Sequence, residues 1–151
     1  ACIPAIQPIP NENIHRISDP FGMRFHPIFK VRRMHQGVDY AALVGTDIHA
    51  TGDGVVYKVE KSRARYGYGN RVYIDHGFGY STVYAHMHEI NVKEGQKIKR
   101  GHIIGTVGTS GSATGPHLHY EVRINNRPVD PAATYLNDLT IQDYEILANS
   151  K

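Results

Sequence analysis

Turn-forming glycines at short intervals constrain the fold of this chain more than any other feature. They stand at positions 52, 54, 67, 69, 77, 79, 95, 101, 105, 108, 111 and 115. The segments between them are rich in β-branched and aromatic residues, and we expect strands near residues 55–59, 71–75, 81–86, 103–107 and 117–124. Short strands at this spacing predict a mainly β fold, an antiparallel sandwich or barrel-like sheet.

Internal similarity and chain length indicate how the fold is organised. Residues 45–50 followed by 53–56 resemble residues 95–101 followed by 103–105, which suggests duplicated β units. A chain of 151 residues fits one domain. We expect an extended, proline-rich lead-in over residues 1–20 and the domain over residues 21–136. Residues 140–143 resemble a helix capping box, which predicts a short helical tail over residues 137–151.

Composition directs attention to histidine, of which the chain has 10 residues. Histidine is the commonest metal ligand and the main general base near neutral pH, so this excess is a reason to look for a site. The net charge of +3 is mildly basic, but the absence of a nucleic-acid motif, of Trp and of a basic stripe interleaved with aromatics argues against nucleic acid as a partner. No apolar run approaches the ~20 residues of a membrane span. Cys2 is the single cysteine, which excludes an internal disulfide and a thiolate metal site.

Residues 117–124 alternate without a break between polar and apolar side chains. One face carries His117, His119, Glu121 and Arg123, and the other carries Leu118, Tyr120, Val122 and Ile124. The apolar face should pack on the core, so the polar face points to solvent or to a site. Because Cβ atoms two residues apart in a strand are about 6.5 Å from each other, His117 and His119 could bind one ion together. Equally, one could bind a metal while the other faces a substrate.

A second candidate group is the pair His35 and Asp39. A carboxylate commonly joins two histidines around zinc. In an extended strand, residues four apart are separated by about 13 Å, so the segment must bend for both side chains to reach one ion. We expect Gly37 to allow this bend.

A third candidate group lies in the strand expected over residues 81–86. Strand alternation places Thr82, Tyr84 and His86 on one face. His88, two residues further on, could share that face.

The three groups together resemble one family. The spaced pair His35-x-x-x-Asp39, the run Tyr84-Ala85-His86 and above all residues 110–121 (SGSATGPHLHYE) are similar to the LytM/lysostaphin-type zinc endopeptidases of bacterial cell walls. Residues 22–27, 69–72 and 92–108 also match stretches common in that family. The similarity spans about Phe21 to Pro131, with all motifs in the right order.

The resemblance implies an antiparallel β fold with a substrate groove and a single Zn²⁺ ion. By position, His35, Asp39 and His119 would be the metal ligands, with water at the fourth position. His86 and His117 would be the catalytic histidines that handle protons. The resemblance thus assigns the roles of His117 and His119 that strand spacing leaves open.

Further residues have weaker assignments. We expect Asn70, Tyr84 and His88 to contact substrate. Two other tyrosines, Tyr66 and Tyr68, could line the groove or pack at its rim. Glu121 is either a hydrogen-bond partner of a ligand histidine or part of a surface ion pair. We expect structural or surface roles for the remaining histidines, at positions 15, 26, 49, 76 and 102.

What the resemblance implies about function is hydrolysis of the peptide cross-links of peptidoglycan, outside the cytoplasm. We expect the protein to be a monomer. The first candidate bond is the D-alanyl–diaminopimelate cross-link, and the pentaglycine bridge is the second. The alternative is a non-catalytic domain that binds the wall or activates an amidase, and such relatives typically lack a metal ligand. Here all three ligand positions and both catalytic histidines are filled, which favours an enzyme. A lipoyl- or biotinyl-type carrier is disfavoured, because no modifiable lysine lies at a matching hairpin tip.

Overall fold

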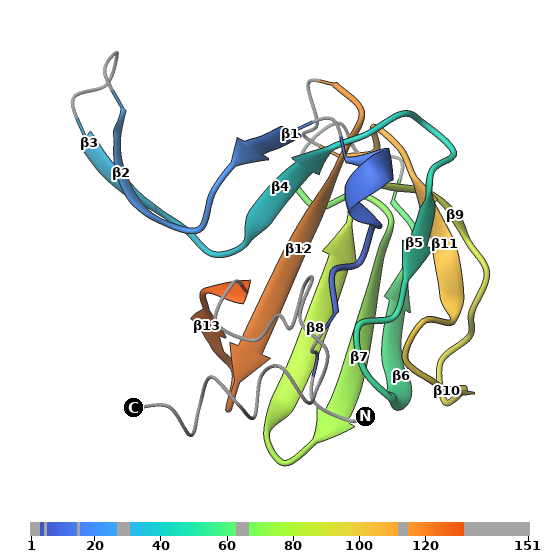
Figure 1. Cartoon of the computed structure of the whole chain (residues 1–151). Coiled ribbons are helices and arrows are strands. Elements are labelled where there is room, and N and C mark those ends of the chain that lie inside the picture. The colour runs from blue at the N-terminus through green and yellow to red at the C-terminus, as the bar shows by residue number, and fades with distance from the viewer. Residues whose placement is uncertain are drawn as a thin grey trace, which may run out of the picture.

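In the computed structural model, residues 4, 6–14, 16–26, 31–62, 67–111 and 115–131 are described, and most of them lie in β-strands (Figure 1). The 3-10 helix η1 (Asn11–Asn13) precedes the strands. The strands are β1 (Arg16–Asp19), β2 (Gly22–His26), β3 (Val31–His35), β4 (Val38–Ala41), β5 (Asp47–His49), β6 (Gly54–Glu60), β7 (Arg71–Gly77), β8 (Tyr80–Ala85), β9 (Met87–Ile90), β10 (Lys97–Ile98), β11 (Ile103–Val107), β12 (His117–Ile124) and β13 (Arg127–Val129).

The strands form three sheets, and every pairing among them is antiparallel. The largest has eight strands in the order β1-β4-β12-β8-β7-β6-β10, with β13 paired to β12. A second sheet has the order β5-β11-β9, and β2 and β3 form a two-stranded ribbon. The expected mainly β, antiparallel fold is confirmed, and all five segments expected as strands are strands. The predicted helical tail over residues 137–151 lies outside the described residues.

The two similar segments of the sequence exchange partners in these sheets. The first segment contributes β5 and β6, and the second contributes β10 and β11. β5 pairs with β11, and β10 pairs with β6. Each segment therefore pairs its first strand with the second strand of the other, an arrangement that fits duplicated β units.

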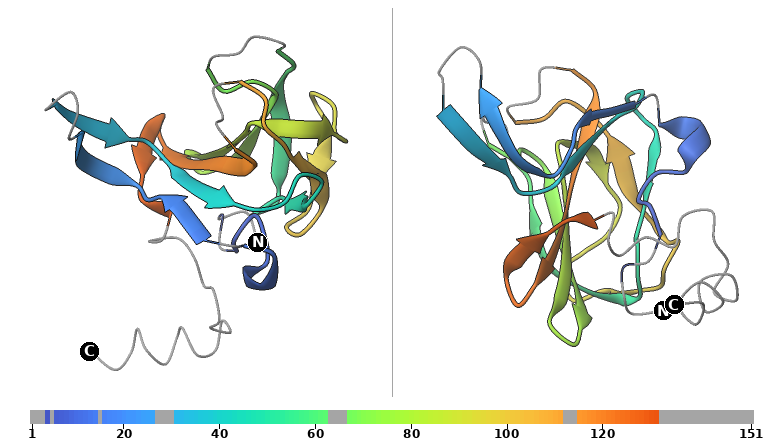
Figure 2. Two further views of the ribbon diagram at one scale, coloured as in Figure 1. Left: turned by 90° about the horizontal axis from the view of Figure 1, so that it is seen from above. Right: turned by 60° about the vertical axis from the view of Figure 1, so that its left-hand side comes forward.

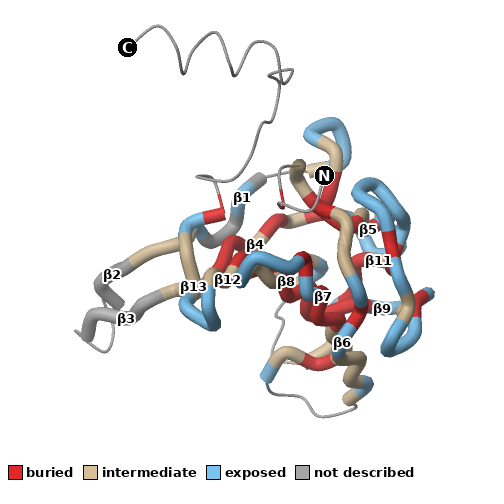
Figure 3. The backbone as a smooth tube through the Cα atoms, turned by 90° about the horizontal axis from the view of Figure 1, so that it is seen from below, coloured by how far each residue is buried: buried red, intermediate tan, exposed pale blue. Residues whose placement is uncertain are grey.

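The core lies against one face of the large sheet. The apolar side of β12 supplies Leu118, Tyr120 and Val122, which have no exposed surface. Figure 3 shows this burial running along β4, β12, β8 and β7, while exposed residues are concentrated in the loops at the periphery. The alternation predicted for residues 117–124 therefore separates core from site as expected.

Buried hydroxyl groups form a chain of hydrogen bonds inside this core. The Tyr120 hydroxyl lies 2.8 Å from Thr51 Oγ1, which in turn lies 3.1 Å from the Tyr84 hydroxyl. The Tyr84 hydroxyl also lies 2.9 Å from Thr82 Oγ1, and His76 Nε2 lies 2.8 Å from that same oxygen. We call these five residues the hydroxyl chain. Because buried polar groups are costly without partners, the chain satisfies groups that the core could not otherwise accommodate.

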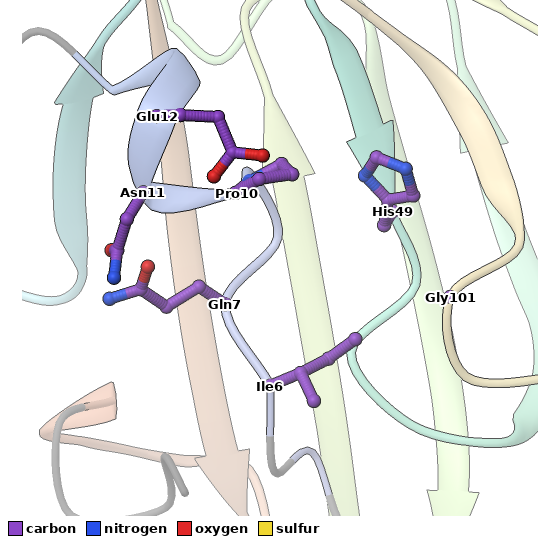
Figure 4. A pocket seen from close by; sticks show the side chains of 7 residues that line it. All are labelled: Ile6, Gln7, Pro10, Asn11, Glu12, His49 and Gly101. Carbon is purple, nitrogen blue, oxygen red and sulfur yellow. The ribbon is translucent and has the colours of Figure 1, made fainter. Parts of the chain in front are cut away.

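The lead-in packs against the domain. Ile9 has no exposed surface and belongs to the core, and the backbone N–H of His49 donates to the carbonyl of Pro8 over 2.8 Å. Further along, β1 pairs with β4. The segment expected to precede the domain is, over its described residues from Pro8 onward, part of the folded unit. Alongside it lies a hollow of about 400 Å³ (Figure 4), lined by Ile6, Gln7, Pro10, Asn11, Glu12, His49 and Gly101.

The ribbon of β2 and β3 extends away from the remaining strands (Figure 2). Its register pairs Gly22 with His35, so His35 stands where the chain leaves the ribbon and approaches β4. Within the part of the chain that the structure describes, no helix has the length and apolar character needed to cross a membrane.

Candidate metal centre

Three segments bring His35, Asp39 and His119 together. His35 ends β3, Asp39 lies in β4, and the β4–β12 register pairs Asp39 directly with His119. Their potential ligand atoms all lie within 4.8 Å of one another. His119 Nδ1 is 2.7 Å from Asp39 Oδ1, and His35 Nε2 is 3.5 Å from Asp39 Oδ2. The predicted ligand set is therefore assembled in one place, mostly by sheet register.

The bend between His35 and Asp39 is present, but Gly37 serves it differently from the prediction. Gly37 does not adopt a positive φ. A Cβ at this position would instead lie 2.3 Å from the carbonyl oxygen of Tyr120 and 3.0 Å from Cε1 of His119. Glycine is needed here because β12 approaches closely, and not because of backbone flexibility.

Hydrogen bonds to the far side of each imidazole set which nitrogen faces the centre. Nδ1–H of His35 donates to the carbonyl of Pro20 over 2.9 Å, which leaves Nε2 toward Asp39. Nε2–H of His119 donates to Oε2 of Glu121 over 2.8 Å, which leaves Nδ1 toward Asp39. Partners of this kind orient the histidine ligands of metal sites.

Glu121 combines the two roles left open by the sequence. Its side chain has no exposed surface. One carboxylate oxygen accepts from His119 and from the Tyr68 hydroxyl, and the other accepts from Nε of Arg123 over 2.9 Å. It is thus both a hydrogen-bond partner of His119 and an ion-pair partner of Arg123.

The electrostatics of the centre favour a cation. Burial alone would lower the pKa of His119, but hydrogen bonds to Asp39 and Glu121 outweigh it and raise that pKa to about 9. Burial alone would raise the pKa of Asp39, and the hydrogen bond and charge of His119 lower it instead. Two carboxylates therefore converge on one imidazole. Of these groups, Asp39 and His119 face the centre together with His35. The three residues offer one carboxylate and two imidazoles, a donor set that suits Zn²⁺.

His86 and His117 lie beside this group. Their ring centroids are 4.7 Å apart, and His117 Nε2 is 3.9 Å from Asp39 Oδ2. Nδ1–H of His86 donates to the carbonyl of Ser110 over 2.6 Å, and Nδ1–H of His117 donates to the carbonyl of Gly115 over 2.9 Å. Both rings therefore keep Nε2 for other partners. Burial lowers the pKa of His86 to about 4, so its imidazole is neutral at pH 7.

Strand alternation is wrong about the orientation of His86. It predicts that His86 shares a face with Tyr84, which points into the core. β8 ends at Ala85, and His86 adopts a φ of 60°, which changes the direction of its side chain. A positive φ is uncommon outside glycine and cannot be seen in a period-2 pattern. Such conformations cluster at functional sites.

Tyr84 does not lie where the sequence analysis placed it. Its side chain has no exposed surface, and its hydroxyl belongs to the hydroxyl chain. It therefore presents no surface to a substrate, contrary to the expectation. Tyr66 lies outside the described residues.

Asn70 and His88 border one hollow near the centre. It measures about 320 Å³ and is lined by Lys61, Asn70, His88, Glu89, Ile90 and Asn91. The Asn70 amide also holds the backbone, because Nδ2 donates to the carbonyl of Met87 over 3.0 Å and Oδ1 accepts from the N–H of Ser62 over 2.9 Å. That Asn70 and His88 contact substrate stays a prediction.

Two further residues belong to the surroundings of the centre. The ring of Tyr68 lies 4.9 Å from that of His119, and its hydroxyl donates to Glu121. Ser110 holds His86 through its carbonyl, and its hydroxyl donates to the carbonyl of Met87 over 2.9 Å. The sequence predicts only a groove or rim position for Tyr68 and no role for Ser110, because both act through contacts between residues far apart in the chain.

Comparisons with known proteins identify the family of this chain. Residues 33–131 match peptidase family M23. The chain is 47% identical over 139 residues to the DD-carboxypeptidase/endopeptidase Mpg of Neisseria meningitidis serogroup B, covering 90% of this chain and 31% of that protein. It is 44% identical over 127 residues to the peptidoglycan DD-endopeptidase ShyA of Vibrio cholerae serotype O1, covering 83% of this chain and 29% of that protein. The chain thus spans about a third of the length of these curated relatives.

Solved structures give the same result. A zinc-containing peptidase from Vibrio cholerae superposes with a TM-score of 0.75 and 40% identity, over 83% of this chain and 38% of that one. Lysostaphin from Staphylococcus simulans superposes with a TM-score of 0.66 and 31% identity, over 78% of this chain and 48% of that one. The predicted resemblance to LytM/lysostaphin-type proteins is confirmed. On its sequence, its fold and the residues brought together at the candidate centre, the chain belongs to peptidase family M23.

Proposed function

We propose that this domain is a zinc-dependent endopeptidase that hydrolyses peptide cross-links of bacterial peptidoglycan outside the cytoplasm. The observation that carries the proposal is the joint placement of His35, Asp39 and His119 beside the histidine pair His86 and His117. When bound, Zn²⁺ polarises the peptide carbonyl and makes a water molecule nucleophilic at neutral pH. The names of two relatives, a DD-carboxypeptidase/endopeptidase and a peptidoglycan DD-endopeptidase, support this substrate class.

The proton transfers fall to the histidine pair. His86 and His117 are oriented through Nδ1 by backbone carbonyls, so each can use Nε2 toward the reacting groups. His86 is neutral at pH 7 because burial lowers its pKa to about 4, and a neutral imidazole can accept a proton from water. As the water oxygen bonds to the carbonyl carbon and the peptide C–N bond breaks, the pair passes that proton to the leaving amine. The three proposed ligands, His35, Asp39 and His119, are not needed for this proton transfer.

We propose the D-alanyl–diaminopimelate cross-link as the substrate bond. The DD-endopeptidase name of a relative favours it, and the pentaglycine bridge stays the second candidate. Incubating the protein with purified muropeptide dimers of each kind, followed by mass spectrometry of the products, separates the two. Cleavage of neither dimer by the zinc-loaded protein would refute the proposal.

Two variants test the assignment of roles. His117→Ala should abolish turnover while the protein still binds one zinc, and His119→Ala should lose the metal. His102→Ala is the matched control, because His102 is exposed and belongs to none of these contacts. Cleavage that persists after chelation, or full zinc content in both variants, would contradict the ligand set. A non-catalytic role is not favoured, since every ligand and catalytic position is filled.

A further inference from the structure

Two tight turns lie side by side at the end of the large sheet opposite the metal group. The β7–β8 hairpin turns at Phe78 and Gly79, and the β12–β13 hairpin turns at Asn125 and Asn126 (Figure 1). All four residues have positive φ, at 53°, 83°, 51° and 65°. This is the two-residue hairpin geometry that matches strand twist. The backbone N–H of Asn125 donates to the carbonyl of Gly79 over 2.8 Å, which ties the two turns together.

Phe78 is an unusual residue for its position in this turn. Asn, Asp or Gly normally occupies the first central position, because positive φ strains a bulky side chain. Phe78 is also 89% exposed, so it gains little from burial that could offset the strain. Backbone strain combined with an exposed ring contributes nothing evident to folding. We look for its role in binding.

A hollow of about 520 Å³ lies against this ring. It is lined by Tyr57, Asp75, Gly77, Phe78, Gly79, Tyr80, Ser81, Asn125 and Asn126. Tyr57 is 44% exposed, and its ring makes a tilted contact with that of Tyr73, with 5.7 Å between the centroids. The hollow therefore combines ring faces with amide, hydroxyl and carboxylate groups.

The chemistry of this lining suits a sugar. Pyranose rings present C–H faces that stack on aromatic rings, and their hydroxyl and acetamido groups hydrogen-bond to amides and carboxylates. The nine lining residues include no lysine or arginine and one carboxylate, Asp75, so the lining itself offers no cation to an anionic peptide or a polyphosphate. A neutral, hydroxyl-rich ligand is the better match.

The hollow shares a face of the sheet with the metal group. His119 and Arg123 lie on one side of β12, because they are four residues apart in an unbroken strand. Arg123 pairs with Ser81, and Ser81 pairs with Asp75. Ser81 and Asp75 line the hollow. The four residues of strand from His119 to Arg123 span about 13 Å, so the near edge of the hollow at Ser81 lies within the reach of a stem peptide of four extended residues.

We propose that this hollow binds the glycan strand of peptidoglycan while a stem peptide attached to that strand reaches the metal centre. The proposal rests on the proposed function, and it adds a second contact with the polymer. Phe78 and Tyr57 provide the stacking surfaces, and the Asn125 and Asn126 side chains provide polar contacts.

The first test is binding of peptide-free sugar. The probe is the N-acetylglucosamine tetramer, titrated into the protein and followed by backbone amide NMR. We expect saturable shifts confined to residues 57, 75–81 and 125–126. Phe78→Asn should keep the turn, because Asn is favoured there, and should weaken binding about fivefold through the lost stacking. Leu43→Asn is the matched control, since Leu43 is 65% exposed and does not line the hollow.

The second test separates this inference from the proposed function. Phe78→Asn should raise KM for intact sacculi about fivefold, and it should leave cleavage of a sugar-free cross-linked peptide unchanged. Absence of sugar binding by an active wild-type protein, or equal binding by wild type and Phe78→Asn, would overturn the glycan site alone. Sugar binding by a protein that cleaves no cross-link would support the glycan site and refute the proposed function.

Discussion

Replacing Glu121 by Gln tests how the chain prepares the metal centre. The substitution keeps the size of a side chain that has no exposed surface. One carboxylate oxygen accepts from His119 and Tyr68, and the other accepts from Arg123. A glutamine amide has one oxygen and one NH₂ group. In either orientation, NH₂ therefore faces a group that also donates, and at least one buried hydrogen bond is lost.

The size of the effect follows from the contact that is lost. A hydrogen bond to a charged group contributes about 1.5–3 kcal/mol, and loss of a partner that orients a ligand histidine typically costs about 10- to 100-fold in metal affinity. We therefore expect Glu121→Gln to bind zinc at least about tenfold more weakly. At pH 7 a proton competes with the metal for His119, whose pKa is about 9, and removing one carboxylate weakens that competition. The loss should consequently be larger at pH 9 than at pH 7.

The assay is competition with a chromophoric chelator at both pH values. The matched control is Glu60→Gln, which makes the same chemical change on the same sheet. It should leave zinc affinity unchanged, because Glu60 pairs with Lys58 and Arg71 and not with a ligand histidine. Wild-type zinc affinity in Glu121→Gln at both pH values would refute the orienting role of this carboxylate. An equal loss of zinc affinity in both variants would mean that the effect comes from the change in net charge and not from the orientation of His119.

Three further outcomes follow from the same contacts. Gly37→Ala should destabilise the fold by about 1–3 kcal/mol and weaken zinc binding, measured by thermal unfolding and metal analysis, because the new Cβ would lie 2.3 Å from the Tyr120 carbonyl oxygen. Tyr84→Phe should cost about 1–3 kcal/mol in urea unfolding and leave kcat unchanged, whereas a loss of kcat with normal stability would restore its predicted contact with substrate. Burial lowers the pKa of His76, so its contribution to stability is present above pH 6.5 and is lost as pH falls toward its lower folded value. His76→Gln should flatten the fall in unfolding free energy below pH 6.5, and an unchanged slope would contradict this assignment.

The strands could be predicted from short-range patterns, and the grouping of His35, Asp39 and His119 could be predicted from the family resemblance. β12 alternates over its whole length between core and site side chains, and this period survives folding because one face of the sheet is buried. His35 and Asp39 are close in sequence, and family similarity supplies the third ligand. Periodicity gave the face of His119, and the resemblance gave its role.

The neighbourhood of the ligands could not be predicted, because it depends on exceptions to the pattern. His86 leaves the face that alternation assigns it, since the backbone adopts a positive φ directly after β8. Alternation places Tyr84 and His86 on the same face of the strand, and only Tyr84 points into the core from that face. Ile9 joins the core from a proline-rich segment that carries no strand signal. Each of these outcomes depends on partners far away in the sequence.

Sheet register fixes where His119 stands along β12 relative to the other residues of the centre. His119 pairs with Asp39 on one side and with Ala85 on the other, so both neighbouring strands fix its position. A slip by one residue would turn Leu118 toward the centre and His119 into the core, because strand side chains alternate in direction. The same slip would turn Glu121 away from its partners His119 and Tyr68. Since the core contacts of Leu118 and Tyr120 oppose such a slip, the energy that stabilises the core also holds the ligand geometry. Core substitutions on this strand should therefore change zinc affinity even though they touch no ligand.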